Sequence, residues 1–275
     1  MSTRQRRRKT RAYKESGDGK QWLMVLAGAA CLIGIVSAGA YHFLNKPKGI
    51  DAQTLCPAEG PLGHVVVLVD QTDPYTFIQS EAFKRHFKNL AKDEVPPGYM
   101  LSVFALGESF EAGAKPLYER CNPGSSEGKS KFDVNIQRLE RRYNQEYLAP
   151  ISEFAESLVS TGKAKQSPVL EMIQLAAING FMASDVNGPR KLIIFSDMLH
   201  NTQDFSMFRG GIPEYETYSS QSYAQKSRAD LQGVRVELNV LIQYPELQTR
   251  KQAVFWEKYF DDMGATLAKF RPVEG

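Results

Sequence analysis

The chain has 275 residues, of which 42% are hydrophobic and 24% are charged, so it can bury a core and does not belong to the disordered class. Its 21 glycines, 14 prolines and 3 cysteines exclude collagen-like, low-complexity and disulfide-framework proteins. The formal net charge of +3 divides into +6 on residues 1–20 and −3 on the remainder. The chain is therefore a mildly acidic body with a short basic arm, and this distribution argues against a nucleic-acid-binding domain.

A membrane-spanning helix is predicted at residues 22–44, from Trp22 to Leu44. This run of 23 residues contains no Asp, Glu, Lys or Arg, and a helix of that length can cross a hydrocarbon core of about 30 Å. The Arg and Lys excess in residues 1–21 predicts a cytoplasmic N-terminus, as in a single-pass protein of a bacterial-type inner membrane. The body is then periplasmic or extracellular.

Two further interpretations of this segment stay open. Residues 38–40 (Ala-Gly-Ala) have the form of a signal-peptidase site, so cleavage before Tyr41 is the alternative to a retained anchor. Small residues also recur every four positions on one helix face, where a second helix can approach closely and the chain can self-associate. Apolar spans are in any case rich in such residues, which here are Ala30, Gly34 and Ala38.

The body is predicted to begin after a linker. Residues 45–63 hold three prolines and three glycines without apolar periodicity, which is typical of a linker. Residues 64–70 and 191–197 are two continuous apolar runs that each end in an acid, the pattern of strands buried on both faces.

Helices and strands alternate through the rest of the body. This order predicts one doubly wound α/β domain at residues 64–275, with a mostly parallel sheet covered by helices on both faces. Further strands are expected at residues 99–106, 116–121 and 234–240, and helices at 76–93, at 136–158 with a kink near Pro150, at 169–182, and through Trp256, Phe260, Met263 and Leu267.

Two acids follow the two most apolar strands. Parallel strands end at one edge of a sheet, so Asp70 and Asp197 are expected to be neighbours there. Two carboxylates held close repel each other unless a proton or cation lies between them, and oxygen ligands suit Mg²⁺, Mn²⁺ or Ca²⁺. Hydroxyl groups are available at Thr72 and Ser167. The plain alternative is local: each acid orients a turn, and Ser167 caps the helix that Pro168 begins.

Three segments in this order resemble the metal-site loops of von Willebrand factor A-type domains, the integrin I-domain fold. They are residues 65–73 (Val-Val-Val-Leu-Val-Asp-Gln-Thr-Asp), the Ser-Pro helix start at 167–168, and residues 192–197 (Leu-Ile-Ile-Phe-Ser-Asp). Their order and spacing cover most of the body. The resemblance implies a von Willebrand A-like fold that binds a protein partner.

The resemblance also implies a ligand set. Asp70 and Thr72 match the first two elements of the family's Asp-x-Ser-x-Ser loop, Ser167 matches the threonine of the second loop, and Asp197 matches the aspartate of the third. Pro74 departs from the pattern, because it stands where the family has its second serine. A bound Mg²⁺ or Mn²⁺ would keep one coordination position for an acidic side chain of the partner.

The cysteines divide between the span and the body. Cys31 lies in the span, and Cys56 and Cys121 are a candidate pair because an exported body meets an oxidising compartment. In the family that the sequence resembles, the third strand is antiparallel at the sheet edge. Cys121 would then emerge opposite the metal site, where the linker with Cys56 enters, which favours a disulfide over two unrelated buried thiols.

Residues 200–230 form a long connection after the second acidic strand end. Long loops at a ligand-binding edge are often functional, and tyrosine-rich surfaces favour protein contacts. Tyr215, Tyr218 and Tyr223 are therefore candidate partner-binding residues. The alternative is a loop folded down over the domain.

Binding is favoured over catalysis, so the chain is not expected to be an enzyme. A Gly-rich phosphate loop, a Gly-x-Ser-x-Gly elbow and a His-Glu-x-x-His motif are all missing from the sequence. One alternative is a metal-dependent phosphoesterase that uses the same acids, with His200 as the candidate general base. Another is a metal-free structural component of an envelope assembly.

Overall fold

The computed structural model describes residues 18–44, 49–107, 114–127, 135–159, 162–184 and 186–273. It contains two compact units, Met1–Lys48 and Gly49–Gly275. Residues 1–17, which hold most of the predicted basic arm, and residues 45–48 of the predicted linker lie outside the described residues.

The described part of the first unit is the helix α1, Asp18–Leu44, which contains the predicted span. Its segment Trp22–Tyr41 is long and apolar enough to cross a membrane, and none of it is buried within the structure. Large apolar side chains on this helix are largely exposed, for example Trp22 at 67% and Leu26 at 58%. A helix that is apolar on all sides needs an apolar environment, and a bilayer supplies one.

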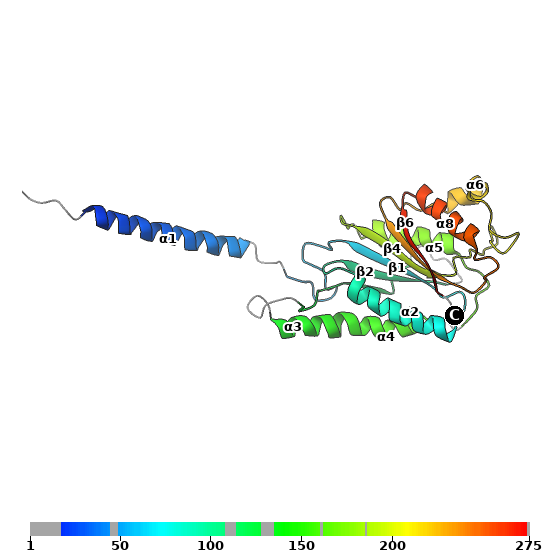
Figure 1. Cartoon of the computed structure of the whole chain (residues 1–275), viewed down its shortest axis with the longest axis horizontal. Helices are drawn as coiled ribbons and strands as arrows, with labels where there is room; N and C mark the ends of the chain where they lie inside the picture. The colour runs from blue at the N-terminus through cyan, green and yellow to red at the C-terminus, as the bar shows by residue number, and fades with distance from the viewer. Residues whose placement is uncertain are drawn as a thin grey trace, which may run out of the picture. The chain divides into compact units, whose positions relative to one another are not determined.

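The second unit is built on one sheet of six described strands in the order β3-β2-β1-β4-β5-β6 (Figure 1). All neighbours pair in parallel except β2 and β3, which are antiparallel. The predicted fold class is therefore confirmed, including the antiparallel strand at the sheet edge. The strands are β1 His64–Asp70, β2 Met100–Leu106, β3 Tyr118–Cys121, β4 Arg190–Ser196, β5 Arg235–Leu241 and β6 Thr266–Val273.

Side chains of β1 alternate between two cores, one on each face of the sheet. Val66 and Leu68 enter the core formed with α5 (Val169–Leu175) and α8 (Arg250–Asp262). Val67 and its neighbours at 65 and 69 enter the core on the other face. Every residue of β1 is buried, which explains its continuous apolar sequence.

The second core is covered by two helical segments, α2 (Phe77–Asn89) and the run from α3 to α4 (Figure 1). A capping box between Thr76 and Gln79 starts α2, and a π-helical turn, Leu90–Glu94, follows it. The run from α3 to α4 consists of α3 Ile136–Arg141, a π-helical segment Arg142–Leu148 and α4 Ala149–Ser157.

Pro150 explains the irregularity in this long helix. Proline has no N–H, so the Glu146 carbonyl loses its helical donor. Arg120 of β3 supplies a replacement, because its Nη1 donates to the Glu146 oxygen at 2.8 Å. The structure thus has a π-helical segment beside Pro150, where the sequence predicts a kink.

The predicted linker is largely part of the folded body. From Gly49 onward the chain belongs to the second unit, Ile50 bridges to Pro57, and Leu55 is completely buried. A disulfide joins Cys56 to Cys121 of β3. Only the part of residues 45–63 that precedes Gly49 lies outside this unit.

The helix predicted near the end of the body, through Leu267, is longer than the helix in the structure. Helix α8 ends at Asp262, and Gly264 then adopts a left-handed φ of 78°, which stops the helix. Leu267 therefore lies in strand β6, which pairs with β5. Its helical spacing from Phe260 is accidental.

We expect the disulfide to stabilise the body. It closes a loop with a sequence separation of 65, and removing such a crosslink costs about 2–5 kcal/mol. Replacing both Cys56 and Cys121 by Ala is expected to lower the free energy of unfolding by this amount, measured by urea denaturation of the detergent-solubilised chain. Replacing Cys31 by Ser is the control. Equal stability of the double variant and the control would contradict the expectation.

Candidate functional site

The register between β1 and β4 brings the two acidic strand ends together. Val69 lies opposite Phe195 in the parallel pair, so Asp70 is next to Ser196 and one residue from the level of Asp197. Asp70 and Asp197 are 4% and 3% exposed. The strand pairing therefore brings the two carboxyl groups to one edge of the sheet, as the sequence predicts.

Hydroxyl groups hold the Asp70 carboxylate. The Thr72 amide donates to Oδ1 at 2.8 Å, and the Thr72 hydroxyl donates to the same atom at 2.6 Å. The Ser196 hydroxyl donates to Oδ2 at 2.6 Å. Both oxygens of Asp70 therefore have partners, and the side chain has a fixed orientation.

Asp197 lies at a sharp turn that follows β4. Met198 has a left-handed φ of 59°, and the Leu199 amide donates to Asp197 Oδ1 at 2.8 Å. The Asp197 carbonyl accepts hydrogen bonds from the side-chain amides of Gln248, at 3.0 Å, and Gln252, at 2.7 Å. Residues that follow β5 therefore hold the backbone of Asp197 in place through its carbonyl group.

Ser167 does not cap a helix, which corrects the prediction. Its backbone pairs with Asn201, and the N-cap of α5 is Pro168, which has no capping side chain. The Leu170 amide instead donates to Nδ1 of His200 at 3.3 Å. Ser167 is 7% exposed, and its buried Oγ has no hydrogen-bond partner.

Three polar residues that the sequence analysis did not select also lie at this edge. The buried Tyr75 hydroxyl has no hydrogen-bond partner, and burial and the charges of Asp70 and Asp197 raise its pKa well above the usual value. Lys163 donates to the Tyr244 hydroxyl at 2.9 Å and lies 3.9 Å from a carboxylate oxygen of Asp73. The Lys163 side chain is 67% exposed, so this ion pair contributes little.

The electrostatics of the two carboxyl groups oppose full ionisation. Burial raises the pKa of Asp70, against the hydrogen bonds from Ser196 and Thr72. Burial, followed by the charge of Asp70, raises the pKa of Asp197 well above its usual value. A pair of this kind retains a proton where isolated carboxyl groups would lose it, or it binds a cation.

The chemistry of the donor set is restricted to oxygen. Among the residues that the structure describes, no group of three or more His, Cys, Asp and Glu side chains could hold a metal. A cation at this edge would therefore depend on two carboxylates and on hydroxyl groups, including the unpartnered Ser167 Oγ.

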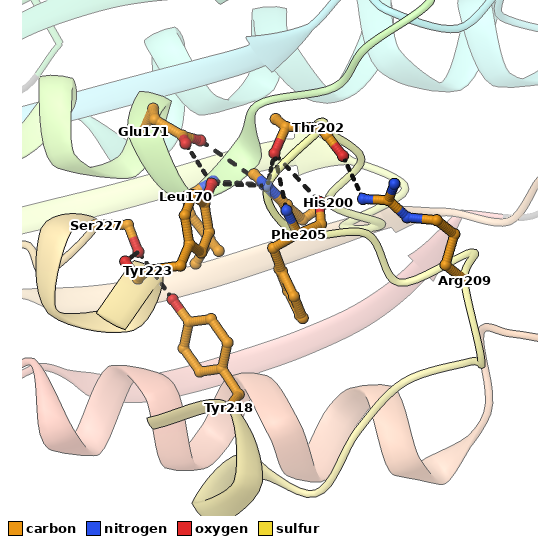
Figure 2. Close-up of polar contacts among 9 residues, drawn as sticks. All are labelled: Leu170, Glu171, His200, Thr202, Phe205, Arg209, Tyr218, Tyr223 and Ser227. Carbon is orange, nitrogen blue, oxygen red and sulfur yellow. Dashed lines mark hydrogen bonds and ion pairs between the residues drawn. The ribbon is translucent and has the colours of Figure 1, made fainter. Parts of the chain in front are cut away.

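His200, at the start of the long loop, is buried and belongs to a hydrogen-bond network with Leu170 and Tyr223 (Figure 2). Its Nδ1 accepts from Leu170, so Nε2 carries the proton and lies 2.9 Å from the Tyr223 hydroxyl. The Tyr223 hydroxyl in turn donates to a carboxylate oxygen of Glu171. His200 is fully buried and both ring nitrogens have partners, so it is not placed as a general base.

The tyrosine-rich loop is folded down over the domain, which corrects its interpretation as an exposed contact surface. It contains two short helices, α6 Tyr215–Ser219 and α7 Ser222–Lys226. Tyr215 and Tyr218 are 8% and 1% exposed and pack on Phe255 of α8. Tyr223 is half-buried against His200.

The sequence indicates the two acids and Thr72, but not Ser196, the second hydroxyl partner of Asp70. Ser196 precedes Asp197 in the sequence, and the β1–β4 register would have placed it opposite Asp70. No local pattern indicates Tyr75, Gln248 or Gln252, because their positions depend on how loops pack at the sheet edge.

No family model and no curated protein sequence matches the chain. Solved structures similar to it include proximal thread matrix protein 1 from the mussel byssus, with 14% identity, a TM-score of 0.36, and coverage of 73% of this chain and 49% of that chain. The chain thus spans about half the length of the mussel protein.

Two other solved structures show a similar level of likeness. The VWA domain of SpRpn10 has 8% identity and a TM-score of 0.39, over 77% of this chain and 89% of that chain. An aerotolerance-related membrane protein from Bacteroides fragilis has 13% identity and a TM-score of 0.34, over 77% of this chain and 91% of that chain. The topology of the described body is a doubly wound, mostly parallel sheet with one antiparallel edge strand.

The buried His200 is expected to make the body less stable in acid. Burial lowers the pKa of His200 to about 3 in the folded protein, whereas the unfolded chain binds this proton below about pH 6.5. Stability is therefore lost as the pH falls below about 6.5, by about 2 kcal/mol from this group at pH 5. Urea denaturation at pH 7 and pH 5 is expected to show a smaller difference for His200→Gln than for the wild type. An unchanged difference would contradict the assignment.

Proposed function

We propose that the chain is a single-pass, membrane-anchored von Willebrand A-like domain that binds a partner protein at the carboxyl edge of β1 and β4. Mg²⁺ or Mn²⁺ would be held there by Asp70, Thr72, Ser167 and Asp197. The observation that carries this proposal is a pair of buried, adjacent carboxyl groups whose pKa values are both raised.

A divalent cation would remove the conflict between the two acids. Their charges repel in a buried setting, and a cation between them offsets both the repulsion and part of the cost of burial. The orphaned Ser167 Oγ supports the same site, because a buried hydroxyl without a partner is costly unless it ligates something.

Pro74 limits the ligand set. It stands where the resemblance calls for a second serine, and it has no side-chain oxygen. Asp73 is turned toward Tyr244 and Lys163, with its Oδ1 3.4 Å from the Tyr244 hydroxyl. Mg²⁺ commonly keeps several water ligands, so water completes the shell in this proposal. An acidic side chain of the partner would then replace one water.

The proposed topology places the basic N-terminal arm in the cytoplasm and the body in the periplasm or outside the cell. The apolar helix α1 supports an anchor, and the disulfide supports an oxidising compartment. Ala30, Gly34 and Ala38 lie on α1 at four-residue intervals, and self-association through them is part of the proposal. A nucleic-acid partner is not proposed.

A metal-free structural role is the competing function. Both oxygens of Asp70 already accept hydrogen bonds from within the chain, so the site is ordered without a cation. In this case the domain would be a structural component of an envelope assembly. A phosphoesterase gains no support from the structure, since His200 faces Tyr223 and Leu170.

Metal binding is expected to raise the melting temperature of the full chain in detergent. A ligand at 100 times its Kd stabilises a folded protein by about 2.7 kcal/mol. Millimolar Mg²⁺ or Mn²⁺ is expected to raise the wild-type melting temperature over that in chelator, and Asp70→Asn is expected to abolish the rise. Asp261→Asn, at an exposed position on α8, is the matched control and is expected to keep it.

The opposite result has a clear meaning. If neither cation raises the wild-type melting temperature, or if Asp70→Asn keeps the full rise, the proposed metal site is wrong and the metal-free structural role is favoured. Capture of a partner that requires metal and is lost in Asp70→Asn would extend the result from binding of the cation to function.

A further inference from the structure

A cavity of about 440 Å³ lies beside α2 on the sheet face that α2 covers, and none of the proposed metal ligands lines it. Residues of β5 alternate between the two faces, and Leu238 and Val240 enter the core beneath α8. Asn239 and Leu241 therefore face the α2 side, where they line the cavity. This volume is within the range of small-molecule sites in proteins.

The cavity carries positive charge that the described part of the chain does not neutralise. Arg85 of α2 and Arg271 of β6 both line it, and neither forms an ion pair or hydrogen bond with another described residue. The nearby lysines on the same sheet face, in contrast to these arginines, have an acidic partner. Lys191 and Lys269 lie 3.0 and 3.1 Å from Glu237, so their charge is compensated within the sheet.

Asn239 is a second and independent indication of a ligand. It is only 2% exposed, and its buried Oδ1 has no hydrogen-bond partner. It is paired with Arg271 across the β5–β6 ladder, so the orphaned amide oxygen and the uncompensated guanidinium are neighbours in one cavity. A buried acceptor without a donor destabilises the protein unless a ligand supplies one.

The remaining wall of the cavity is mostly apolar, with His86 and Asn89 of α2 as its polar members. Ile78 is 60% exposed although it lies next to a buried ring, Phe195. Leu241 and Val273 complete this wall. A ligand that matches this cavity would carry an anionic group for the arginines, a hydrogen-bond donor for Asn239 and an apolar part for the apolar wall.

We propose that this cavity binds a small organic acid that carries an apolar ring and an N–H or O–H donor. The carboxylate lies against Arg85 and Arg271, the donor binds Asn239 Oδ1, and the ring packs on Ile78 and Val273. Guanidinium groups bind carboxylates through charge-assisted hydrogen bonds, which are the strongest of these contacts. The site is separate from the acidic edge at Asp70.

Indole-3-acetate has all three parts and serves as the probe. Isothermal titration of the full chain in detergent is expected to show saturable binding of this acid. Binding of the neutral indole-3-acetamide is expected to be at least about tenfold weaker. Arg271→Gln is expected to weaken binding of the acid by a similar factor. Arg138→Gln, an exposed arginine on α3, is the matched control and is expected to bind as the wild type does.

Asn239 is tested with 1-methylindole-3-acetate, which lacks the N–H. Methylation is expected to weaken binding to the wild type and to have a smaller effect on binding to Asn239→Leu. The same variant is expected to have a higher melting temperature without ligand, because it removes a buried polar group that has no partner. Lack of saturable binding, equal binding of acid and amide, or equal affinity of Arg271→Gln and Arg138→Gln would overturn the proposal.

Discussion

The parallel register of β1 against β4 is the constraint on which the rest of the structure depends. With Val69 opposite Phe195, both strands end at the same level, and Asp70 and Asp197 share one buried edge. A shift by one residue would exchange the β1 side chains between the two cores, so the fit of Val66 and Leu68 in one core and of Val67 in the other favours this register. The closeness of the two acids is thus a consequence of core packing.

The loops at this edge are fixed by polar contacts that reach across the domain. Gln252 of α8 donates to the Asp197 carbonyl, and Trp256 of the same helix donates to the Met198 carbonyl at 2.9 Å. His200 then ties the start of α5 to the folded-down loop through Tyr223. In the proposed function, this fixed backbone would let a cation bind with little rearrangement.

The sequence predicts the strands and the acids well because both depend on strong local patterns. Continuous apolar runs identify β1 and β4, and an acid after each run is visible without a structure. Leu267 was misplaced because a helical spacing continued past Gly264, whose left-handed backbone ends α8. The helix-capping role of Ser167 and the surface position of Tyr218 are wrong because both depend on loop packing, and neither the hydrogen-bond partners nor the burial of a loop residue follow from local sequence.

The most direct test of this account is a carboxyl-carbon NMR titration of the two aspartates in the full chain, in chelator. If Asp70 and Asp197 share a buried edge, at least one of the two is expected to titrate well above the ordinary aspartate value of about 3.9. Asp70→Asn is then expected to lower the pKa of Asp197, because the charge of Asp70, which together with burial raises that pKa, is gone. Ordinary pKa values for both acids, with no response of Asp197 to this substitution, would contradict the account.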